Sequence, residues 1–404
     1  MRWAMIALAF LATVINYLDR QTLSVAAPIL RRELGFGDIE YSRIVSAFML
    51  AYTVMNGLSG PLIDRIGTRW GYGLCMLWWS TASLLHSFAR SAFSLGVFRF
   101  LLGMGEAGNW PAALKLVNEW FPVRERALAS GIFNSGSAIG ALAAPPLVAW
   151  LILHFGWKSA FAAVSLAGYA WLAIFMATYR TPPEVVAEVQ AAPPQALKLF
   201  SQRFVWSLTL AKLFFDPAWY FYIFWFPQYL SSARHFDMAQ IGLYSWIPFL
   251  TADMGNIAGG LLASFLIRRG VALMTTRKIC FFLFAGCMTS AIPAVLVESA
   301  YVSIALVACA TFGYTACSAN MMALPGDVYP KNAQASIWGL ASMGSGFGGM
   351  MWSLVTGLLV ASFSYVPVFF LFGLMPLVCA TILFAVTCRS KNTLRQASPT
   401  GSGR

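Results

Sequence analysis

Long apolar segments, each about the length of a bilayer crossing and separated by short charged loops, constrain this chain more than any other feature. A helix needs about 20 apolar residues to cross the hydrocarbon core, and such segments recur twelve times along the 404 residues. Hydrophobic residues make up 59% of the chain and charged residues 10%, whereas soluble domains are about 45–50% apolar and about 25% charged. We therefore predict an all-α integral membrane protein.

The twelve predicted spans divide into six and six. They are residues 4–29, 42–62, 70–89, 92–114, 127–153, 158–179, 204–230, 241–267, 278–297, 301–324, 334–362 and 365–387. We predict a first six-helix bundle over residues 1–180, a proline-rich cytoplasmic linker over 181–203, a second bundle over 204–388 and a cytoplasmic tail over 389–404. The apolar start from Trp3 exceeds the length of a signal peptide, so we interpret it as the first span.

The net charge of +12 comes mainly from Lys and Arg residues in the loops between the spans. These residues do not form one continuous basic face, so the charge does not indicate nucleic-acid binding. Of the 27 Lys and Arg residues, three lie within spans, eighteen on the side of the N-terminus and six on the other side. The positive-inside rule then places both termini in the cytoplasm. The seven cysteines show no CxxC or Cys/His spacing, so we expect no metal, cofactor or disulfide framework. No nucleophile or cofactor motif indicates an enzyme.

Seven ionisable residues fall inside the predicted spans. They are Asp19, Arg20, Arg99, Glu106, Lys212, Asp216 and Asp253. Each charge at the centre of a spanning helix costs about 2.5–3.5 kcal/mol on insertion scales, and such residues usually mark a transport pathway. The alternative is a set of buried ion pairs that only fixes helix packing. We expect a binding site for a charged solute.

Two arginines in the first half are predicted to lie at similar depth. The first span runs outward and the fourth runs inward, so the rise of 1.5 Å per residue brings Arg20 and Arg99 to the same level. Glu106 follows Arg99 by two helical turns on the same face. Paired guanidinium groups suit a carboxylate ligand. For Glu106, burial favours the protonated form and a nearby arginine favours the charged form, so we predict that it binds a proton.

The second half offers a charged pair and aromatic side chains. Lys212 and Asp216 are one turn apart and can pair directly, and Pro217 follows. Trp219 and Tyr220 can stack against a sugar ring or simply pack. The role of Asp253 is left open between binding hydroxyl groups and packing. Further candidate substrate-binding residues with weaker support are Tyr17, Tyr52 and Asn320.

The loop between the second and third spans resembles the signature loop of the major facilitator superfamily. It reads Gly-Pro-Leu-Ile-Asp-Arg-Ile-Gly-Thr-Arg over residues 60–69. The resemblance covers the whole chain and implies two six-helix bundles, with a cytoplasmic gate at Asp64, Arg65 and Arg69. The corresponding loop of the second half, residues 260–270, has Ser264 where the acid would stand.

A narrower resemblance rests on Asn16-Tyr17-Leu18-Asp19-Arg20, on residues 99–108 and on residues 119–126. These are similar to the anion:cation symporter family, and residues 216–219, 246–248 and 252–255 are similar to hexuronate carriers, whereas the acid at Asp19 is typical of galactonate-type carriers. The resemblance implies that Arg20 and Arg99 hold the substrate carboxylate, that Asp19 and Glu106 handle protons and that Tyr52 lines the site. The glycine spacing of the antiporter signature is not met in the fifth span, which favours symport.

Together these features predict a monomeric secondary transporter of the bacterial inner membrane. It would carry a small organic anion, such as a hexuronate or aldonate, with a cation that we expect to be a proton. The alternatives are an exchanger of organic anions or organophosphates, and uptake of a dicarboxylate or an aromatic acid.

Overall fold

The computed structural model describes residues 2–180, 202–328 and 331–389, and these ranges contain helices and no strands. The first half comprises α1 (Arg2–Leu34), α2 (Asp38–Ile66), α3 (Thr68–His86), α4 (Ala92–Glu106), α5 (Asn109–Trp120), α6 (Val123–Phe155) and α7 (Trp157–Thr178). The second comprises α9 (Arg203–Arg234), α10 (Met238–Tyr244), α11 (Ile247–Arg268), α12 (Leu273–Met288), α13 (Ala291–Leu296), α14 (Ala300–Val328), α15 (Lys331–Ser362) and α16 (Val366–Arg389).

Each predicted span corresponds to one helix or to two consecutive helices. The fourth span is α4 followed by α5, the eighth is α10 followed by α11, and the ninth is α12 followed by α13. Within the described ranges, eight helical segments are long and apolar enough to cross a membrane by length and composition alone. Helix α9 is not among them because it carries Lys212, Asp216 and several Trp and Tyr residues. Most of the predicted linker, residues 181–201, and of the tail, residues 390–404, lie outside the described residues.

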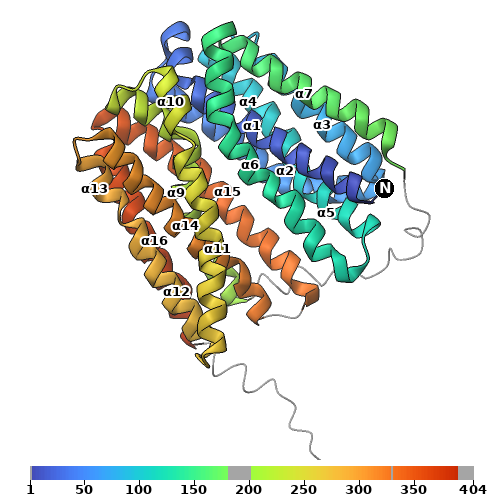
Figure 1. The fold of residues 1–404 in the computed structure, drawn as a ribbon, viewed down its shortest axis with the longest axis vertical. Helices are drawn as coiled ribbons and strands as arrows, with labels where there is room; N and C mark the ends of the chain where they lie inside the picture. Colours follow the sequence, from blue (N-terminus) through green and yellow to red (C-terminus); the bar gives the residue numbers. More distant parts are fainter. Residues whose placement is uncertain (1, 181–201, 329–330, 390–404) are drawn as a thin grey trace, which may run out of the picture.

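The helices form two groups, α1–α7 and α9–α16, which lie side by side in Figure 1. Within the first group α1 packs on α6 and α2 packs on α4; within the second, α9 packs on α15 and α11 packs on α14. Glycines allow these close crossings. A Cβ atom on Gly348 of α15 would lie 2.5 Å from the Leu213 carbonyl oxygen of α9, which is the close backbone approach that small residues permit in membrane bundles.

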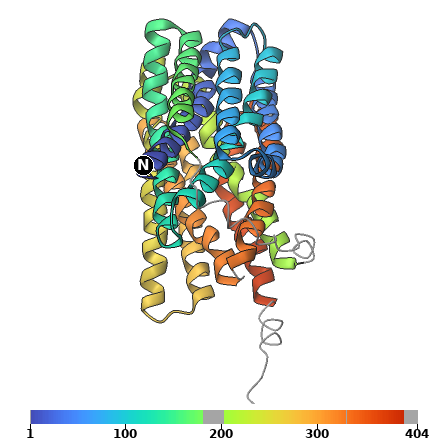
Figure 2. The same cartoon turned by 90° about the vertical axis from the view of Figure 1, so that its right-hand side faces the viewer.

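The two groups meet through α1 with α9, α2 with α15, and α6 with α10 and α11. Figure 2 shows the first group, in blue and green, in front of part of the second, whose orange and red helices extend below it. The hydrogen bonds that join the groups in the described residues involve Tyr41 with the Phe224 carbonyl, Ser46 with the Met350 carbonyl, and Gln228 with Asp38. All of them lie toward the end of the molecule that holds the α1–α2 turn, which we call the closed end.

Candidate functional site

The centre of the candidate site is a buried ion pair between α1 and α4. The Nε and Nη2 atoms of Arg20 donate to Glu106 Oε2 at 3.1 and 2.9 Å. Arg20 Nη2 also donates to Asn16 Oδ1, one turn earlier, at 3.3 Å. The Glu106 side chain is fully buried, with 0% exposure, and its Oε1 atom has no hydrogen-bond partner among the described residues. The pair therefore carries no net charge, and Glu106 Oε1 can still accept a hydrogen bond.

Aromatic rings surround this pair. The Arg20 guanidinium lies 5.2, 5.3 and 4.8 Å from the ring centres of Tyr17, Phe48 and Tyr52. Such contacts stabilise a cation that has been removed from water. Two of the weaker candidates, Tyr17 and Tyr52, are thus beside Arg20.

Arg99 lies beside the same Phe48 ring as Arg20, but its hydrogen bonds go to backbone carbonyls. Its guanidinium is 5.9 Å from the Phe48 ring, and its Nη1 and Nη2 atoms donate to the backbone carbonyls of Arg20 and Asp19 at 3.5 and 3.3 Å. Only 1% of its surface is exposed. In this conformation Arg99 therefore holds the segment of α1 that carries Arg20, rather than facing an open space beside it.

Asp19 faces away from Arg20, toward α3. It accepts a hydrogen bond from the Ser83 hydroxyl, and its Oδ2 atom has no hydrogen-bond partner among the described residues. Consecutive residues on a helix point about 100° apart, which explains why these neighbours in sequence have different partners. Ser83 was not predicted from the sequence, because a serine in an apolar span is common.

The second group contributes its own buried pair. Lys212 Nζ lies 2.7 Å from Asp216 Oδ2, and the Tyr314 hydroxyl of α14 donates to Asp216 Oδ1 at 3.0 Å. The expected i,i+4 pairing is therefore present. Tyr314 was missed by the sequence analysis, although a polar aromatic residue within an apolar span was an available signal.

The aromatic residues after Pro217 connect this pair to the first group. Trp219 stacks on Tyr314 with ring centres 5.2 Å apart. The Tyr220 hydroxyl bonds to Ser345 at 3.1 Å, and its ring stacks on Phe224 with centres 6.3 Å apart. Phe224 packs against Phe48 of α2 with centres 6.1 Å apart, and the Arg20 guanidinium lies 5.3 Å from the Phe48 ring. Aromatic contacts therefore run from the helix that carries Asp216 to Arg20.

Two other predicted residues have different surroundings. Asn320 accepts from Arg277 at 3.0 Å and donates to the Gly259 and Ala316 carbonyls. These contacts lie among α11, α12 and α14, and none of them joins Asn320 to Arg20 or Tyr220. Asp253 is half-buried on α11, and no ion-pair partner for it is found in the described ranges.

The signature loop makes its contacts within the first group. Asp64 Oδ1 lies 2.8 Å from Lys115 Nζ, and Arg69 donates to the Met176 carbonyl at 2.8 Å. Arg65 is exposed. In this conformation neither Asp64 nor Arg69 contacts the second group through these bonds, so the predicted latch between the halves stays a prediction.

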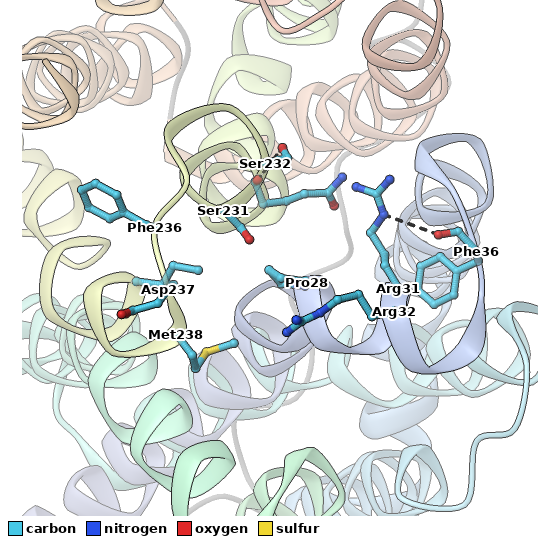
Figure 3. A pocket seen from close by; sticks show the side chains of 11 residues that line it. Pro28, Arg31, Arg32, Phe36, Ser231, Ser232, Phe236, Asp237 and Met238 are labelled. Carbon is cyan, nitrogen blue, oxygen red and sulfur yellow. Dashed lines mark hydrogen bonds between the residues drawn. The ribbon is translucent and has the colours of Figure 1, made fainter. Parts of the chain in front are cut away.

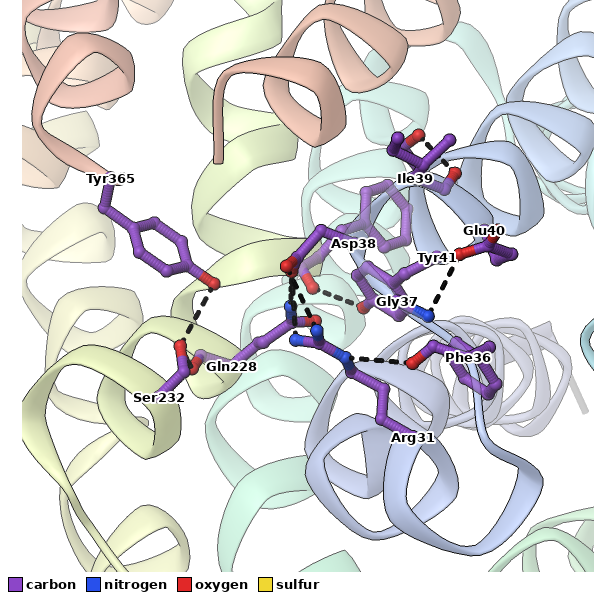
Figure 4. Close-up of polar contacts among 12 residues, drawn as sticks. Arg31, Phe36, Gly37, Asp38, Ile39, Glu40, Tyr41, Gln228, Ser232 and Tyr365 are labelled. Carbon is purple, nitrogen blue, oxygen red and sulfur yellow. Dashed lines mark hydrogen bonds and ion pairs between the residues drawn. The ribbon is translucent and has the colours of Figure 1, made fainter. Parts of the chain in front are cut away.

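At the closed end, a polar network joins the two groups (Figure 4). Asp38 Oδ2 accepts from Arg31 of α1 at 3.0 Å, and its Oδ1 accepts from Gln228 of α9 at 2.5 Å. Beside this network lies a cavity of about 590 Å³, lined by Pro28, Arg31 and Arg32 on one side and by Ser231, Ser232 and Asp237 on the other (Figure 3). The sequence analysis did not identify this network, because Asp38 and Gln228 are 190 residues apart.

The chain matches the Major Facilitator Superfamily family model over residues 9–352. It belongs to that superfamily. It is 33% identical over 405 residues to the "Hexuronate transporter" of Escherichia coli (strain K12), covering 96% of this chain and 94% of that protein. It is also 33% identical over 336 residues to the "Galacturonate transporter" of Dickeya chrysanthemi, covering 78% of this chain and 97% of that protein.

Solved structures share the fold. A bacterial homologue of the human lysosomal transporter Spinster, in an inward-facing and unoccupied conformation, has a TM-score of 0.77 at 18% identity and covers 99% of both chains. The D-xylose-proton symporter has a TM-score of 0.75 at 13% identity, covering 95% of this chain and 97% of that one. The protein is therefore a multi-span membrane transporter with the major facilitator fold.

Proposed function

We propose that this transporter carries a sugar-acid monoanion together with a proton across the bacterial inner membrane by alternating access. The Arg20–Glu106 pair carries the proposal, because Arg20 can bind a carboxylate and Glu106 competes for it. Arg20 lies beside Phe48, which packs against Phe224 of the second helix group. The hexuronate and galacturonate carriers among its relatives support a sugar acid as the substrate.

Charge balance in the site couples the binding of the proton to the binding of the substrate anion. In the empty state Glu106 neutralises Arg20 through two short bonds. A proton on Glu106 weakens these bonds and leaves the guanidinium available for the paired hydrogen bonds that a substrate carboxylate accepts. With both proton and anion bound, the site is neutral again. A site with only one of them holds an unbalanced buried charge, which is costly in a membrane interior, so half-loaded states resist closure.

Other residues assist in this scheme. Arg99 holds the α1 backbone beside Arg20 and reaches the same carboxylate if its side chain turns. Asp19, which has one unpartnered oxygen in the described structure, is a second proton-binding residue. Tyr17, Tyr52, Trp219 and Tyr220 contact the rest of the sugar acid. Asn320, whose amide is occupied within the second group, is not included.

The two ends of the molecule have different roles in the cycle. With both termini cytoplasmic, the closed end faces the periplasm, and the conformation is inward-facing. The network around Asp38 is then the outer gate, and Asp64, Arg65 and Arg69 act at the cytoplasmic side when the site opens outward. Rocking of two bundles about a midplane site is the usual scheme for such inverted-repeat folds.

Uptake into proteoliposomes tests the proposal. We expect wild-type protein to accumulate labelled galacturonate when the lumen is made alkaline. Glu106→Gln resembles the protonated state without titrating, so this variant is expected to exchange labelled for unlabelled galacturonate but not to accumulate it. Asp19→Asn is expected to lose accumulation as well. Wild-type exchange without accumulation would indicate an exchanger, and unchanged accumulation in both variants would rule out these acids as proton carriers.

A further inference from the structure

We propose that Asp216 restricts this transporter to substrates with a single carboxylate, by neutralising Lys212 in the second helix group. The inference rests on the proposed function and extends it to a choice between monocarboxylates and dicarboxylates. A second cation near the site would favour a second carboxylate on the substrate. The structure contains such a cation but pairs it with an acid.

The position of the Asp216 carboxylate is fixed on both oxygens. Oδ2 lies 2.7 Å from Lys212 Nζ, and Oδ1 accepts from the Tyr314 hydroxyl at 3.0 Å. The side chains of Lys212 and Asp216 are only 9% and 7% exposed. Water therefore screens the pair weakly, so each charge largely cancels the other for a ligand that approaches from outside the pair.

Tyr314 is itself held in place by two rings of α9. Its ring stacks on Phe215 with centres 4.6 Å apart and on Trp219 with centres 5.2 Å apart. Phe215 and Trp219 are one turn apart on α9, and both pack against the Tyr314 ring. Asp216 lies between them in sequence and accepts a hydrogen bond from the Tyr314 hydroxyl. This packing keeps the carboxylate beside Lys212 and away from alternative rotamers.

The pair lies on α9 in the second helix group, whereas Arg20 lies on α1 in the first. Tyr220, one turn after Asp216 on α9, stacks on Phe224, and Phe224 packs against Phe48, which lies beside the Arg20 guanidinium. A six-carbon acid with its carboxylate on Arg20 would extend its other end toward α9. An aldehyde or hydroxyl end can be accommodated there by tyrosine hydroxyls. A second carboxylate would meet a neutralised lysine.

A second ion pair of this helix group is also charge-balanced, because Arg277 of α12 lies 2.8 Å from Asp327. Replacing Asp216 by a neutral residue removes the negative charge beside Lys212, and we expect this change to favour a second carboxylate on the substrate.

The test is competition for galacturonate uptake in proteoliposomes by unlabelled galacturonate and by galactarate, the corresponding dicarboxylate. Wild-type protein is expected to prefer galacturonate strongly. Asp216→Asn keeps the shape of the side chain but removes its charge, and the ratio of the two inhibition constants should shift toward galactarate by at least about tenfold, as expected for one new hydrogen bond between charged groups. Asp216→Ser should shift it in the same direction, which keeps the test available if the amide variant does not fold.

Two control variants separate charge from packing. Tyr314→Phe removes a hydrogen bond but leaves the Lys212–Asp216 pair, so the ratio should stay near the wild-type value. Lys212→Gln combined with Asp216→Asn removes the cation as well, and the gain in galactarate affinity should disappear. Retention of that gain in the double variant would overturn the inference.

Two further outcomes would also overturn it: a wild-type protein that accepts both acids equally, or a folded Asp216→Asn variant that carries galacturonate with an unchanged ratio. If wild-type protein carries neither acid, the proposed function itself fails. The two failures are therefore distinguishable.

Discussion

Replacing Arg20 by methionine would leave Glu106 as a buried carboxylate without its hydrogen-bonded partner. Arg20 supplies both hydrogen bonds that Glu106 Oε2 accepts, at 3.1 and 2.9 Å, and Oε1 has no partner among the described residues. Because the Glu106 side chain is 0% exposed, water cannot replace the lost bonds. Removing one member of a buried pair costs about 3–5 kcal/mol.

The double variant Arg20→Met/Glu106→Leu should recover most of this loss. It removes both charges and fills the site with apolar groups of similar volume, and such replacements are often neutral or stabilising. One kcal/mol corresponds to about 2 °C in melting temperature for a domain of about 200 residues. We therefore expect Arg20→Met to melt at least about 6 °C below wild type, and the double variant to melt well above Arg20→Met.

Tryptophan fluorescence of the purified protein, heated in one detergent, is a suitable assay. Arg31→Met is a matched control, since the Arg31–Asp38 pair at the closed end is 22% and 18% exposed, and partly exposed pairs contribute less. Its melting temperature should fall by less than that of Arg20→Met. The reasoning would be refuted if Arg20→Met melted with wild type, or if the double variant were as unstable as Arg20→Met.

Two further predictions concern the interfaces between helices. Asp38→Ala removes the acceptor that ties Gln228 to the first group, and a bond to a charged group is worth about 1.5–3 kcal/mol. Ser46 is buried at the closed end, so a Ser46→Cys side chain can report opening there. We expect it to react about tenfold faster with a membrane-impermeant maleimide when Asp38 is replaced by alanine. An equal rate would argue against a gate at this end. Gly348→Ala places a Cβ atom 2.5 Å from a carbonyl oxygen of α9, whereas Gly260→Ala meets nothing within 4 Å. Overpacking costs about 1–3 kcal/mol, so only the Gly348 variant should melt lower, and a similar decrease in both would contradict this reading of the α9–α15 contact.

The spanning helices and the charged residues within them were predictable from the amino-acid sequence. Span length and composition follow from the thickness of the bilayer, so the predicted segments agree with the helices to within a few residues at most ends. The i,i+4 pairing of Lys212 with Asp216 was also predictable, because it is a property of one helix. The signature loop at residues 60–69 predicted the superfamily, which the family match confirms.

Which face of each helix contacts which neighbour became known only from the packing of the helices. Arg20 pairs with Glu106, while Asp19 next to it bonds to Ser83 of another helix. Asn320 turns into the second group, and Tyr314 reaches Asp216 across 98 residues. The periodicity and composition of the apolar segments do not specify the rotation and tilt of one helix against another. That choice is made by the packing of side chains, such as the close approach at Gly348, and it depends on many residues that are distant in sequence.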